Sequence, residues 1–469
     1  MVVDFMIKNR KNIEIRTKKC YYLEKEEAAF MLVEYKVKNF LSFKDEIVLS
    51  MVADKNRELT DSNTFTYGNM TLLKCAAVFG ANASGKTNLI SSFDFFSTLF
   101  ADNINASELI ENIPCFRLDI ESIDHPTTFE ITFFLKGKRY RYGIELNRNR
   151  ICAEWLFFVP SRQEACYFQR EANSITYTGT YFEDKKALDY IKPDSERPFL
   201  YTLGQDSIKE FQWAKDIVKY IRFYIKSRSL PDAFFKDMLE RHIISCSDDK
   251  IVTKEEVISF MNDADIGIVD LSIKEKKDEE DEILNSFIEF MRQKGKHIDK
   301  NEFDTYFHHT KYDSQHRIAG EEKFSIETES SGTAKLYSML YPILYILKMG
   351  GVLLIDEIES SLHPLLCEKI VQLFNDTNKN SHNAQLIFTT HNTLLMNPKI
   401  LRRDQIYFME KDKYGVSKMY SLYDIDIDIR SNFNYLNNYL AGRFGAIPYL
   451  GLFEIKSEVD GGTLCEKKA

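Results

Sequence analysis

Runs of alternating apolar and polar residues make the N-terminal third of the chain rich in predicted strands. Two such runs, residues 32–40 and 47–51, lie on either side of a polar turn. Alternation with a period of two is typical of half-buried strands.

Further runs of this kind lie within residues 115–180, where a glycine turn separates two of them. A glycine turn between two strand-like runs favours a hairpin, so we expect residues 115–180 to form an antiparallel β-lobe. Its predicted strands are residues 129–135, 140–146, 155–159, 165–168 and 174–177.

From residue 184 to about residue 300 the apolar positions recur mainly at helical spacing. Phe211, Ala214 and Ile217 are one example. A short strand is expected at 266–271, and the mixed charge block at 274–282 is typical of a solvated face or a loop. No heptad repeat runs through this part, so we expect a mainly helical insertion and not a coiled-coil arm.

These changes of pattern divide the chain into five parts. The domain proper is expected to begin near Met31, where the strand-like alternation starts, and either Met1 or Met31 is the native start. The expected parts are an N-terminal extension (1–30), an N-terminal half with the β-lobe (31–183), a mainly helical insertion (184–319), a C-terminal half (320–450) and a tail (451–469).

The stretch from Gly80 to Thr87, GANASGKT, fits the phosphate-loop pattern G-x-x-x-x-G-K-[ST]. It follows an apolar, strand-like run and precedes apolar residues at helical spacing, so a phosphate would lie at a helix N-terminus. The glycines allow a tight turn, Lys86 brings a positive charge to the β- and γ-phosphates, and the Thr87 hydroxyl is a ligand for Mg²⁺. The expected nucleotide-binding residues are Gly80, Asn82, Ala83, Ser84, Gly85, Lys86, Thr87 and Asn88.

A continuous apolar run, residues 352–355, ends in Asp356 and Glu357. Such a run is typical of a central parallel strand, which here would deliver two acids to the carboxyl edge of a sheet. Asp356 would hold Mg²⁺ beside Thr87, and Glu357 would orient or deprotonate the attacking water.

A second apolar run, residues 385–390, is followed by His391. A histidine at the same edge can hydrogen-bond a γ-phosphate oxygen or the attacking water. The expected catalytic residues are Lys86, Glu357 and His391, and the expected metal ligands are Thr87 and Asp356.

The 469-residue chain has an ordinary globular composition, with 44% hydrophobic and 28% charged residues, and is long enough for two or three domains. Its formal net charge of −9 provides no overall basic field, so any nucleic-acid contact would have to be local. Residues 222–228 interleave basic and aromatic side chains, a pattern that suits either a nucleic-acid surface or an ordinary amphipathic element.

The eight cysteines are scattered, with neither zinc-ribbon nor disulfide-framework spacing, which favours a reduced cytoplasmic compartment. Apolar runs of about 18 residues are missing, so we expect neither a signal peptide nor a membrane-spanning helix. His308 and His309 would point to opposite faces of a strand, which favours structural roles for them and for His316 over a metal site.

Several motifs, in order, make the chain resemble the ABC/SMC-like, AAA-type ATPases. The resemblance is to the heads of SMC-like proteins and to the ATPases of bacterial phage-defence operons, the OLD-like and RloA-like branch, and it covers residues 31–180 and 320–450. The motifs are the opening segment at 33–46, GANASGKT, a signature-like segment at 329–333, LLIDE at 353–357, a D-loop-like segment at 359–364, TTHN at 389–392 and the closing segment at 439–448.

The resemblance implies an α/β fold, namely an ABC-type P-loop NTPase head with a mixed sheet, an antiparallel β-lobe and a helical insertion. It also implies ATP binding and hydrolysis with Mg²⁺, and a homodimer or higher homo-oligomer. Ser330, Ser331 and Gly332 would then act in trans, with the following helix pointing its positive end at the γ-phosphate held by a second subunit. The signature departs from the family pattern, because it lacks a second adjacent glycine and a terminal glutamine.

Two functions follow from the resemblance. In the first, an ATP-dependent dimer acts as the sensor or regulator of an anti-phage defence system and controls a separate, nuclease-like effector. The alternative is an OLD-type, ATP-dependent nuclease component that acts directly on DNA. The residues after Glu357 contain no further acidic cluster of the kind found in TOPRIM nuclease domains, which favours the first function. A transporter subunit is disfavoured by the β-lobe and the insertion.

Overall fold

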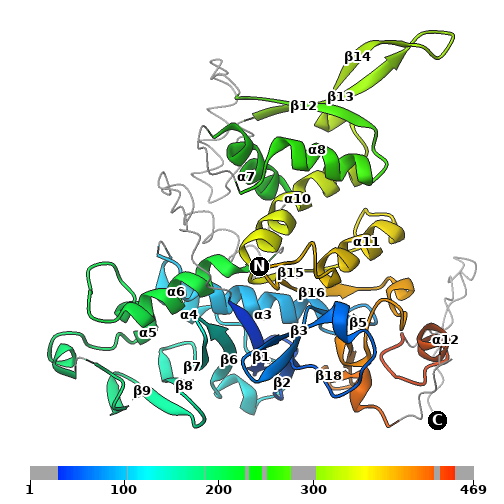
Figure 1. Cartoon of the computed structure of the whole chain (residues 1–469). Helices are drawn as coiled ribbons and strands as arrows, with labels where there is room; N and C mark the ends of the chain where they lie inside the picture. Colours follow the sequence, from blue (N-terminus) through cyan, green and yellow to red (C-terminus); the bar gives the residue numbers. More distant parts are fainter. Residues whose placement is uncertain are drawn as a thin grey trace, which may run out of the picture.

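The computed structural model describes residues 30–102, 104–183, 185–227, 232–245, 251–275, 303–426 and 434–448. The expected extension up to residue 29, the tail at 451–469 and most of the charge block at 274–282 lie outside these residues. The described part is a mixed α/β fold in which helices lie between and around several sheets (Figure 1). The α/β class expected from the sequence is thereby confirmed.

A six-stranded sheet at the centre of the molecule carries the phosphate loop. Its strands are β5 (Cys75–Gly80), β11 (Ile225–Ser227), β15 (Val352–Ile355), β16 (Gln385–Thr390), β17 (Ile406–Lys411) and β18 (Ser417–Ser421). Their order is β11-β15-β16-β5-β17-β18, and all neighbours are parallel except the antiparallel pair of β17 and β18. Parallel neighbours end at the same edge, so the segments that follow β5, β15 and β16 start side by side.

A seven-stranded antiparallel sheet forms a second layer. Its strands are β1 (Met31–Lys38), β2 (Ile47–Ser50), β6 (Thr127–Leu135), β7 (Lys138–Leu146), β8 (Ile151–Val159), β9 (Ala165–Glu171) and β10 (Ser174–Thr178). Their order is β10-β9-β8-β7-β6-β1-β2. The antiparallel pairing expected for the β-lobe is present, and the lobe continues into β1 and β2, which the sequence pattern treated as a separate pair.

One buried amide joins the two sheets. Gln385 Oε1, at the start of β16, accepts a hydrogen bond from the Leu32 N–H at 2.6 Å. Its Nε2 donates to the carbonyl oxygens of Leu32 and Leu73, each at 3.0 Å. Both polar atoms of this fully buried side chain are therefore satisfied, and β1 is held in one position against the central sheet.

Two hydrophobic cores lie on the two faces of the central sheet. Ala76 and Val78 of β5 belong to the first core, which α3 (Lys86–Thr98) shares with the antiparallel sheet. Ala77 and Phe79 belong to the second core, together with α10 (Ser331–Met349) and α11 (Pro364–Asn375). Successive side chains of a strand point to opposite faces, so strands that are buried on both faces have continuous apolar sequences.

The segment between β10 and α10 is divided between these two cores. Helices α5 (Phe199–Leu203) and α6 (Gln212–Tyr224) pack into the first core, and α7 (Asp232–Ile244) and α8 (Lys254–Asp263) pack into the second. A three-stranded sheet accompanies α7 and α8, with strands β12 (Ile268–Glu275), β13 (Phe303–Tyr312) and β14 (Ile318–Ser325). The insertion therefore contains more β-structure than its helical spacing predicted.

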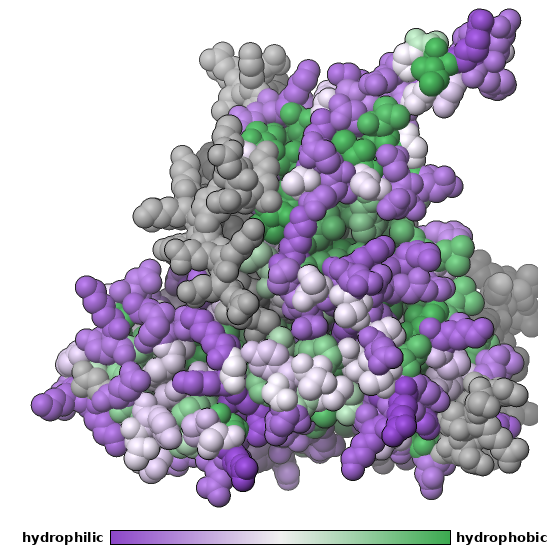
Figure 2. Space-filling view, in the orientation of Figure 1, coloured by the Kyte–Doolittle hydropathy of each residue, from purple (hydrophilic) through white to green (hydrophobic). Residues whose placement is uncertain are grey.

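The hairpin of β13 and β14 projects from the rest of the molecule (Figure 1), and Figure 2 shows its tip covered with hydrophilic residues. Among the described residues, no helix combines the length and the apolar character needed to cross a membrane. The smaller elements are α2 (Thr60–Asn63), β3 (Thr64–Tyr67), β4 (Met70–Leu73), α4 (Ala106–Glu111) and α12 (Tyr435–Leu440).

A buried ion pair holds α5 against the β-lobe. The side chains of Glu154 in β8 and Arg170 in β9 are fully buried, and Arg170 Nη1 lies 3.2 Å from Glu154 Oε2. The same carboxylate accepts hydrogen bonds from the N–H groups of Phe199 and Leu200, at 2.7 and 2.9 Å. Burial raises the pKa of Glu154, while Arg170 and the two N–H groups act against that rise.

Glu154→Ala is expected to lower the free energy of unfolding by roughly 3–5 kcal/mol, because the buried charge of Arg170 would lose its counter-ion. Glu164→Ala is the control. Glu164 forms a partly exposed pair with Arg141, and its loss should cost less than about 1 kcal/mol. Urea unfolding followed by tryptophan fluorescence measures both variants. Equal losses would contradict the role of the buried pair.

Candidate functional site

The phosphate loop turns from β5 into α3 at the carboxyl edge of the central sheet. Gly85 is the N-cap residue of α3 and has φ 113°, and Ala83 has φ 60°, so both lie in the region that favours glycine. A Cβ atom on Gly80 would lie 2.2 Å from the Met409 carbonyl oxygen, and one on Gly85 would lie 2.5 Å from Ser417 Oγ. Close packing therefore requires a glycine at both positions.

Two serines outside the phosphate-loop motif hold the loop in place through hydrogen bonds. Ser417 Oγ lies 2.6 Å from the Ser84 carbonyl oxygen and 2.7 Å from Ser42 Oγ. Ser42 Oγ in turn accepts a hydrogen bond from Asn88 Nδ2 at 2.6 Å. No local signal marks Ser417, whereas Ser42 belongs to the family-like opening segment. The fold alone brings them together.

Lys86 lies among opposite charges. Its ammonium group is buried and donates hydrogen bonds to the carbonyl oxygens of Gly80 and Ala81, each at 2.9 Å. Burial lowers the pKa of Lys86, and the carboxylates of Asp356, Glu357 and Glu359 oppose that effect. Lys86, the first residue of α3, thus shares an electrostatic environment with the acids that follow β15.

Asp356 and Glu357 follow β15 directly, and one hydroxyl group of β16 connects them. Thr389 Oγ1 donates to Asp356 Oδ1 at 2.6 Å and accepts a hydrogen bond from the Glu357 N–H at 2.8 Å. Asp356 is half-buried, whereas Glu357 is exposed and has φ 48°. The arrangement leaves the Glu357 carboxylate free to face solvent at the edge of the sheet.

His391 follows β16 and is anchored through its backbone. Its N–H donates to Glu359 Oε1 at 2.5 Å, and the neighbouring Thr390 Oγ1 donates to Glu359 Oε2 at 2.7 Å. Burial and Lys86 lower the pKa of the His391 imidazole, against the opposite effects of Glu359, Glu357 and Asp356. No local sequence signal marks the individual roles of Thr389, Thr390 and Glu359.

The signature-like segment starts α10. Ser330 is the N-cap residue, and its Oγ accepts a hydrogen bond from the Thr333 N–H at 3.0 Å. The helix begins at Ser331. Ser330 and Ser331 are exposed, and a Cβ atom on Gly332 would lie 2.9 Å from the Ser361 carbonyl oxygen of the same chain.

The residues at this edge fit a nucleotide with Mg²⁺. Thr87 and Asp356 supply oxygen donors of the type that Mg²⁺ prefers, and phosphate oxygens and water usually complete its shell. The Ser84 hydroxyl is buried and has no hydrogen-bond partner among the described residues, so it is available to a ligand. Across the described ranges, no group of three or more His, Cys, Asp or Glu side chains forms a metal site by itself.

The basic and aromatic stretch at 222–228 has structural contacts where it is described. Arg222 Nε donates to the Phe100 carbonyl oxygen at 2.5 Å, and its guanidinium pairs with Asp102. Ile225 is buried in β11, at the edge of the central sheet. The contacts of Arg222 and the burial of Ile225 agree with the interpretation of this stretch as an ordinary amphipathic element.

The two adjacent histidines of β13 also have separate partners. His308 Nε2 lies 2.6 Å from Ser272 Oγ, and His309 Nε2 lies 2.9 Å from Glu329 Oε1. Their partners are on different segments, as expected for neighbouring positions on a strand. His316 lies between β13 and β14.

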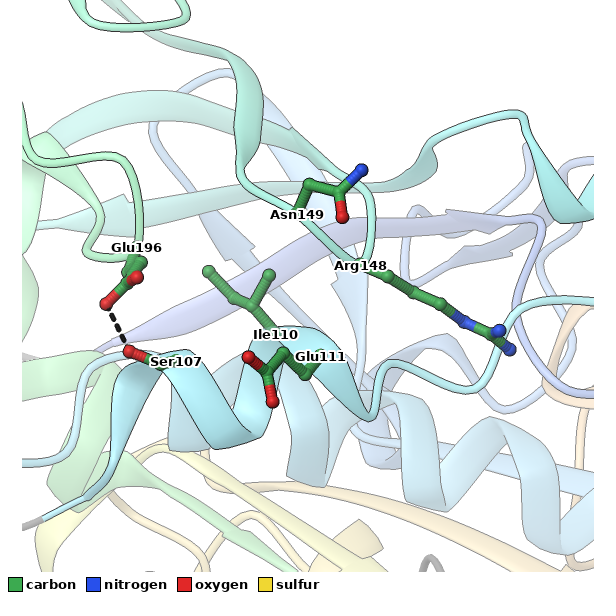
Figure 3. A pocket seen from close by; sticks show the side chains of 6 residues that line it. All are labelled: Ser107, Ile110, Glu111, Arg148, Asn149 and Glu196. Atoms are coloured by element: carbon green, nitrogen blue, oxygen red, sulfur yellow. Dashed lines mark hydrogen bonds between the residues drawn. The ribbon is translucent and has the colours of Figure 1, made fainter.

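A small cavity of about 170 Å³ lies between α4, the turn from β7 to β8 and the segment before α5 (Figure 3). Its one hydrogen bond between lining residues joins Ser107 Oγ to Glu196 Oε2 at 2.5 Å. Figure 3 shows the Arg148 guanidinium extending away from the carboxylates of Glu111 and Glu196. The charged groups do not converge, and none of the lining residues belongs to the phosphate loop or the β15 and β16 edge.

Gly85→Ala is expected to weaken nucleotide binding by roughly 10-fold or more, because the new methyl group would crowd Ser417 and Ser42 and strain the backbone. Titration with a fluorescent ATP analogue measures the affinity. Gly137→Ala is the control, since Gly137 also has positive φ but has no atoms within 4 Å of an added Cβ. Parental affinity in Gly85→Ala would contradict the packing argument.

His391 is expected to titrate below the ordinary histidine pKa of 6.5. Lys86→Met should raise that pKa, because the variant removes a positive charge that disfavours the imidazolium form. NMR of histidine-labelled protein measures the titration, and His391→Gln identifies the resonance. An unchanged or lower pKa in Lys86→Met would show that Lys86 does not act on His391.

Comparison with known proteins finds a matching family. A family described as "AAA domain, putative AbiEii toxin, Type IV TA system" matches residues 75–397, from the start of β5 to just beyond His391. No curated protein matches the chain. The matched range is well over half of the chain.

Solved structures that are similar to the chain include two SMC heads. The "SMC head domain from Thermotoga maritima" is 14% identical with a TM-score of 0.37, over 85% of this chain and 100% of the other. The SmcHead bound to the C-winged helix domain of ScpA is 14% identical with a TM-score of 0.43, over 83% and 98%. From the family match over residues 75–397, the protein belongs to this family of AAA domains.

Proposed function

We propose that the chain is an ATPase that dimerises on ATP and acts as the sensor or regulator of an anti-phage defence system, controlling a separate effector such as a nuclease. One observation carries the ATPase part. The phosphate loop, the Asp356-Glu357 pair and His391 follow three adjacent parallel strands and lie at one edge of one sheet. The family to which the chain belongs is one of AAA domains, which supports the same activity.

Each residue of this edge has a distinct task in phosphoryl transfer to water. The positive charge of Lys86 stabilises the negative charge of the β- and γ-phosphates. Thr87 and Asp356 would hold Mg²⁺, which neutralises phosphate charge when it is bound. Glu357 orients the water and accepts its proton, and His391 hydrogen-bonds the water or a γ-phosphate oxygen. Most of the rate enhancement comes from positioning and charge stabilisation, so the fixed strand ends matter more than any single basic group.

The exposed start of α10 supports dimerisation. Ser330 and Ser331 are exposed, and they stand at the N-terminus of a 19-residue helix, where free N–H groups and the helix dipole favour a phosphate. In the proposed dimer, Ser330, Ser331 and Gly332 of one subunit contact the γ-phosphate held by the other. The nucleotide then joins the two subunits, and its hydrolysis separates them.

The defence role rests on the resemblance of the motifs and on the family description. That description names a toxin and a "Type IV TA system". We place the protein in the cytoplasm, because the described cysteines, Cys75, Cys115, Cys152, Cys166 and Cys367, are free thiols. A regulator of this kind converts ATP binding into a change of assembly that a separate effector recognises.

Glu357→Gln should retain ATP binding and lower the hydrolysis rate by about 100-fold or more, because the group that accepts the proton from water is lost. The ATP-bound dimer should then accumulate. Lys86→Ala should lose nucleotide binding and remain monomeric with ATP. Phosphate release measures the rate, and size-exclusion chromatography with light scattering, with and without ATP, measures the assembly.

The outcomes separate the candidate functions. Glu357→Gln protein that hydrolyses ATP at the parental rate would overturn the role of that glutamate. A Glu357→Gln variant that stays monomeric in saturating ATP would overturn ATP-dependent dimerisation. Nuclease activity of the purified chain alone would favour the OLD-type nuclease over a regulator with a separate effector.

A further inference from the structure

Glu359 lies in the loop between β15 and α11, and its side chain is half-buried at the edge of the central sheet. Its two carboxylate oxygens accept hydrogen bonds from two consecutive residues, the Thr390 hydroxyl at 2.7 Å and the His391 N–H at 2.5 Å. Both donors are at the end of β16, the strand next to the one that leads into the Glu359 loop. The carboxylate therefore bridges two strand ends.

We infer that Glu359 is a positioning residue for ATP hydrolysis, because its carboxylate clamps Thr390 and His391 to the loop that carries Asp356 and Glu357. This inference rests on the proposed ATPase function. A carboxylate accepts two hydrogen bonds at once through its two oxygens, and hydrogen bonds to an ionised acceptor are stronger than neutral ones. Fixing the His391 backbone limits where its imidazole can lie.

The clamp completes a continuous set of contacts between this loop and the end of β16. The Glu357 N–H donates to Thr389 Oγ1 at 2.8 Å, and the Ile358 N–H donates to the Thr389 carbonyl oxygen at 3.1 Å. With Glu359, three consecutive residues of the loop after β15 are hydrogen-bonded to the last two residues of β16 and to His391, which follows them. The spacing between Glu357 and His391 is therefore set by hydrogen bonds near the reacting groups.

Backbone geometry indicates that this loop depends on such contacts. Glu357 has φ 48° and Ser361 has φ 61°, so left-handed residues lie on both sides of Glu359. Non-glycine residues adopt this conformation only at a cost, and they keep it where surrounding contacts enforce it. Ser361 also lies against the signature segment, since a Cβ atom on Gly332 would come within 2.9 Å of its carbonyl oxygen. Glu359 thus lies two residues before Ser361 in the chain, and its carboxylate accepts a hydrogen bond from the His391 N–H.

Two substitutions of Glu359 distinguish a positioning role of its side chain from a role of its negative charge alone. Glu359→Gln keeps the length of the side chain, so its amide oxygen still accepts from the His391 N–H, while the negative charge is lost. Glu359→Asp keeps the charge but withdraws the carboxylate by about 1.5 Å, which places both donors beyond hydrogen-bond distance. A positioning role therefore predicts the larger defect in Glu359→Asp, and a role of charge alone predicts the reverse order.

For Glu359→Asp we expect kcat to fall about 10- to 100-fold, with KM for ATP within about twofold of the parental value. For Glu359→Gln we expect kcat within about threefold of the parental value. Glu322→Gln on β14 is the matched control, since Glu322 is exposed and pairs with Lys311 at 2.6 Å, and it should leave both constants unchanged. Thermal unfolding of each variant checks that the fold is intact.

Hydrogen–deuterium exchange of the His391 amide provides a second measurement that does not depend on catalysis. Exchange should be slow in the parental protein and in Glu359→Gln, and at least about 10-fold faster in Glu359→Asp. Equal exchange in all three proteins would overturn the clamp. A kcat defect in Glu359→Gln as large as that in Glu359→Asp, or none in Glu359→Asp, would overturn the positioning role.

The two hypotheses fail in different ways. If the parental protein hydrolyses no more ATP than Lys86→Ala, the proposed ATPase function fails, and amide exchange still decides whether Glu359 holds His391. If the parental protein hydrolyses ATP and Glu359→Asp equals it in kcat and in exchange, the inference alone fails.

Discussion

The parallel pairing of β15, β16 and β5 is the constraint on which the candidate site depends. Ile355 pairs with Phe388, and Thr390 pairs with Phe79, so the three strands end close together at one edge of the sheet. Neighbouring strands are about 4.8 Å apart, which brings the groups that follow them within reach of a single phosphate chain. Both faces of these strands are buried in hydrophobic cores, and this burial fixes the register.

Hydrogen bonds between the strand ends then convert proximity into a defined geometry. The hydroxyl group of Thr389 contacts both Asp356 and the Glu357 N–H, and Glu359 contacts the next two residues of the same strand end. Electrostatics acts on the same groups. Three carboxylates stabilise the charge of the buried Lys86, and Lys86 in turn disfavours charge on His391. A change in any one of these groups therefore alters the position or the electrostatic environment of the others.

Local sequence was sufficient to predict the phosphate loop, the strand before it and the helix after it, because a tight glycine turn between apolar segments is a short-range feature. The two acids after β15 and the histidine after β16 could be predicted from apolar strands that end in polar residues. The three-stranded sheet of the insertion was harder to predict. Residues of β14 are almost all exposed, so no buried face imposes an apolar alternation on them.

The sequence by itself determined which side chains are candidates for the chemistry and which apolar strands they follow, since both are written in contiguous residues. Tertiary structure alone decided what supports those side chains. Ser42 and Ser417 are far apart in the sequence and meet behind the phosphate loop, and Gln385 joins β1 to β16 across a similar separation. Such contacts have no sequence signal, because a buried hydrogen bond depends on the position of its partner in space, and only the packing of both sheets defines that position.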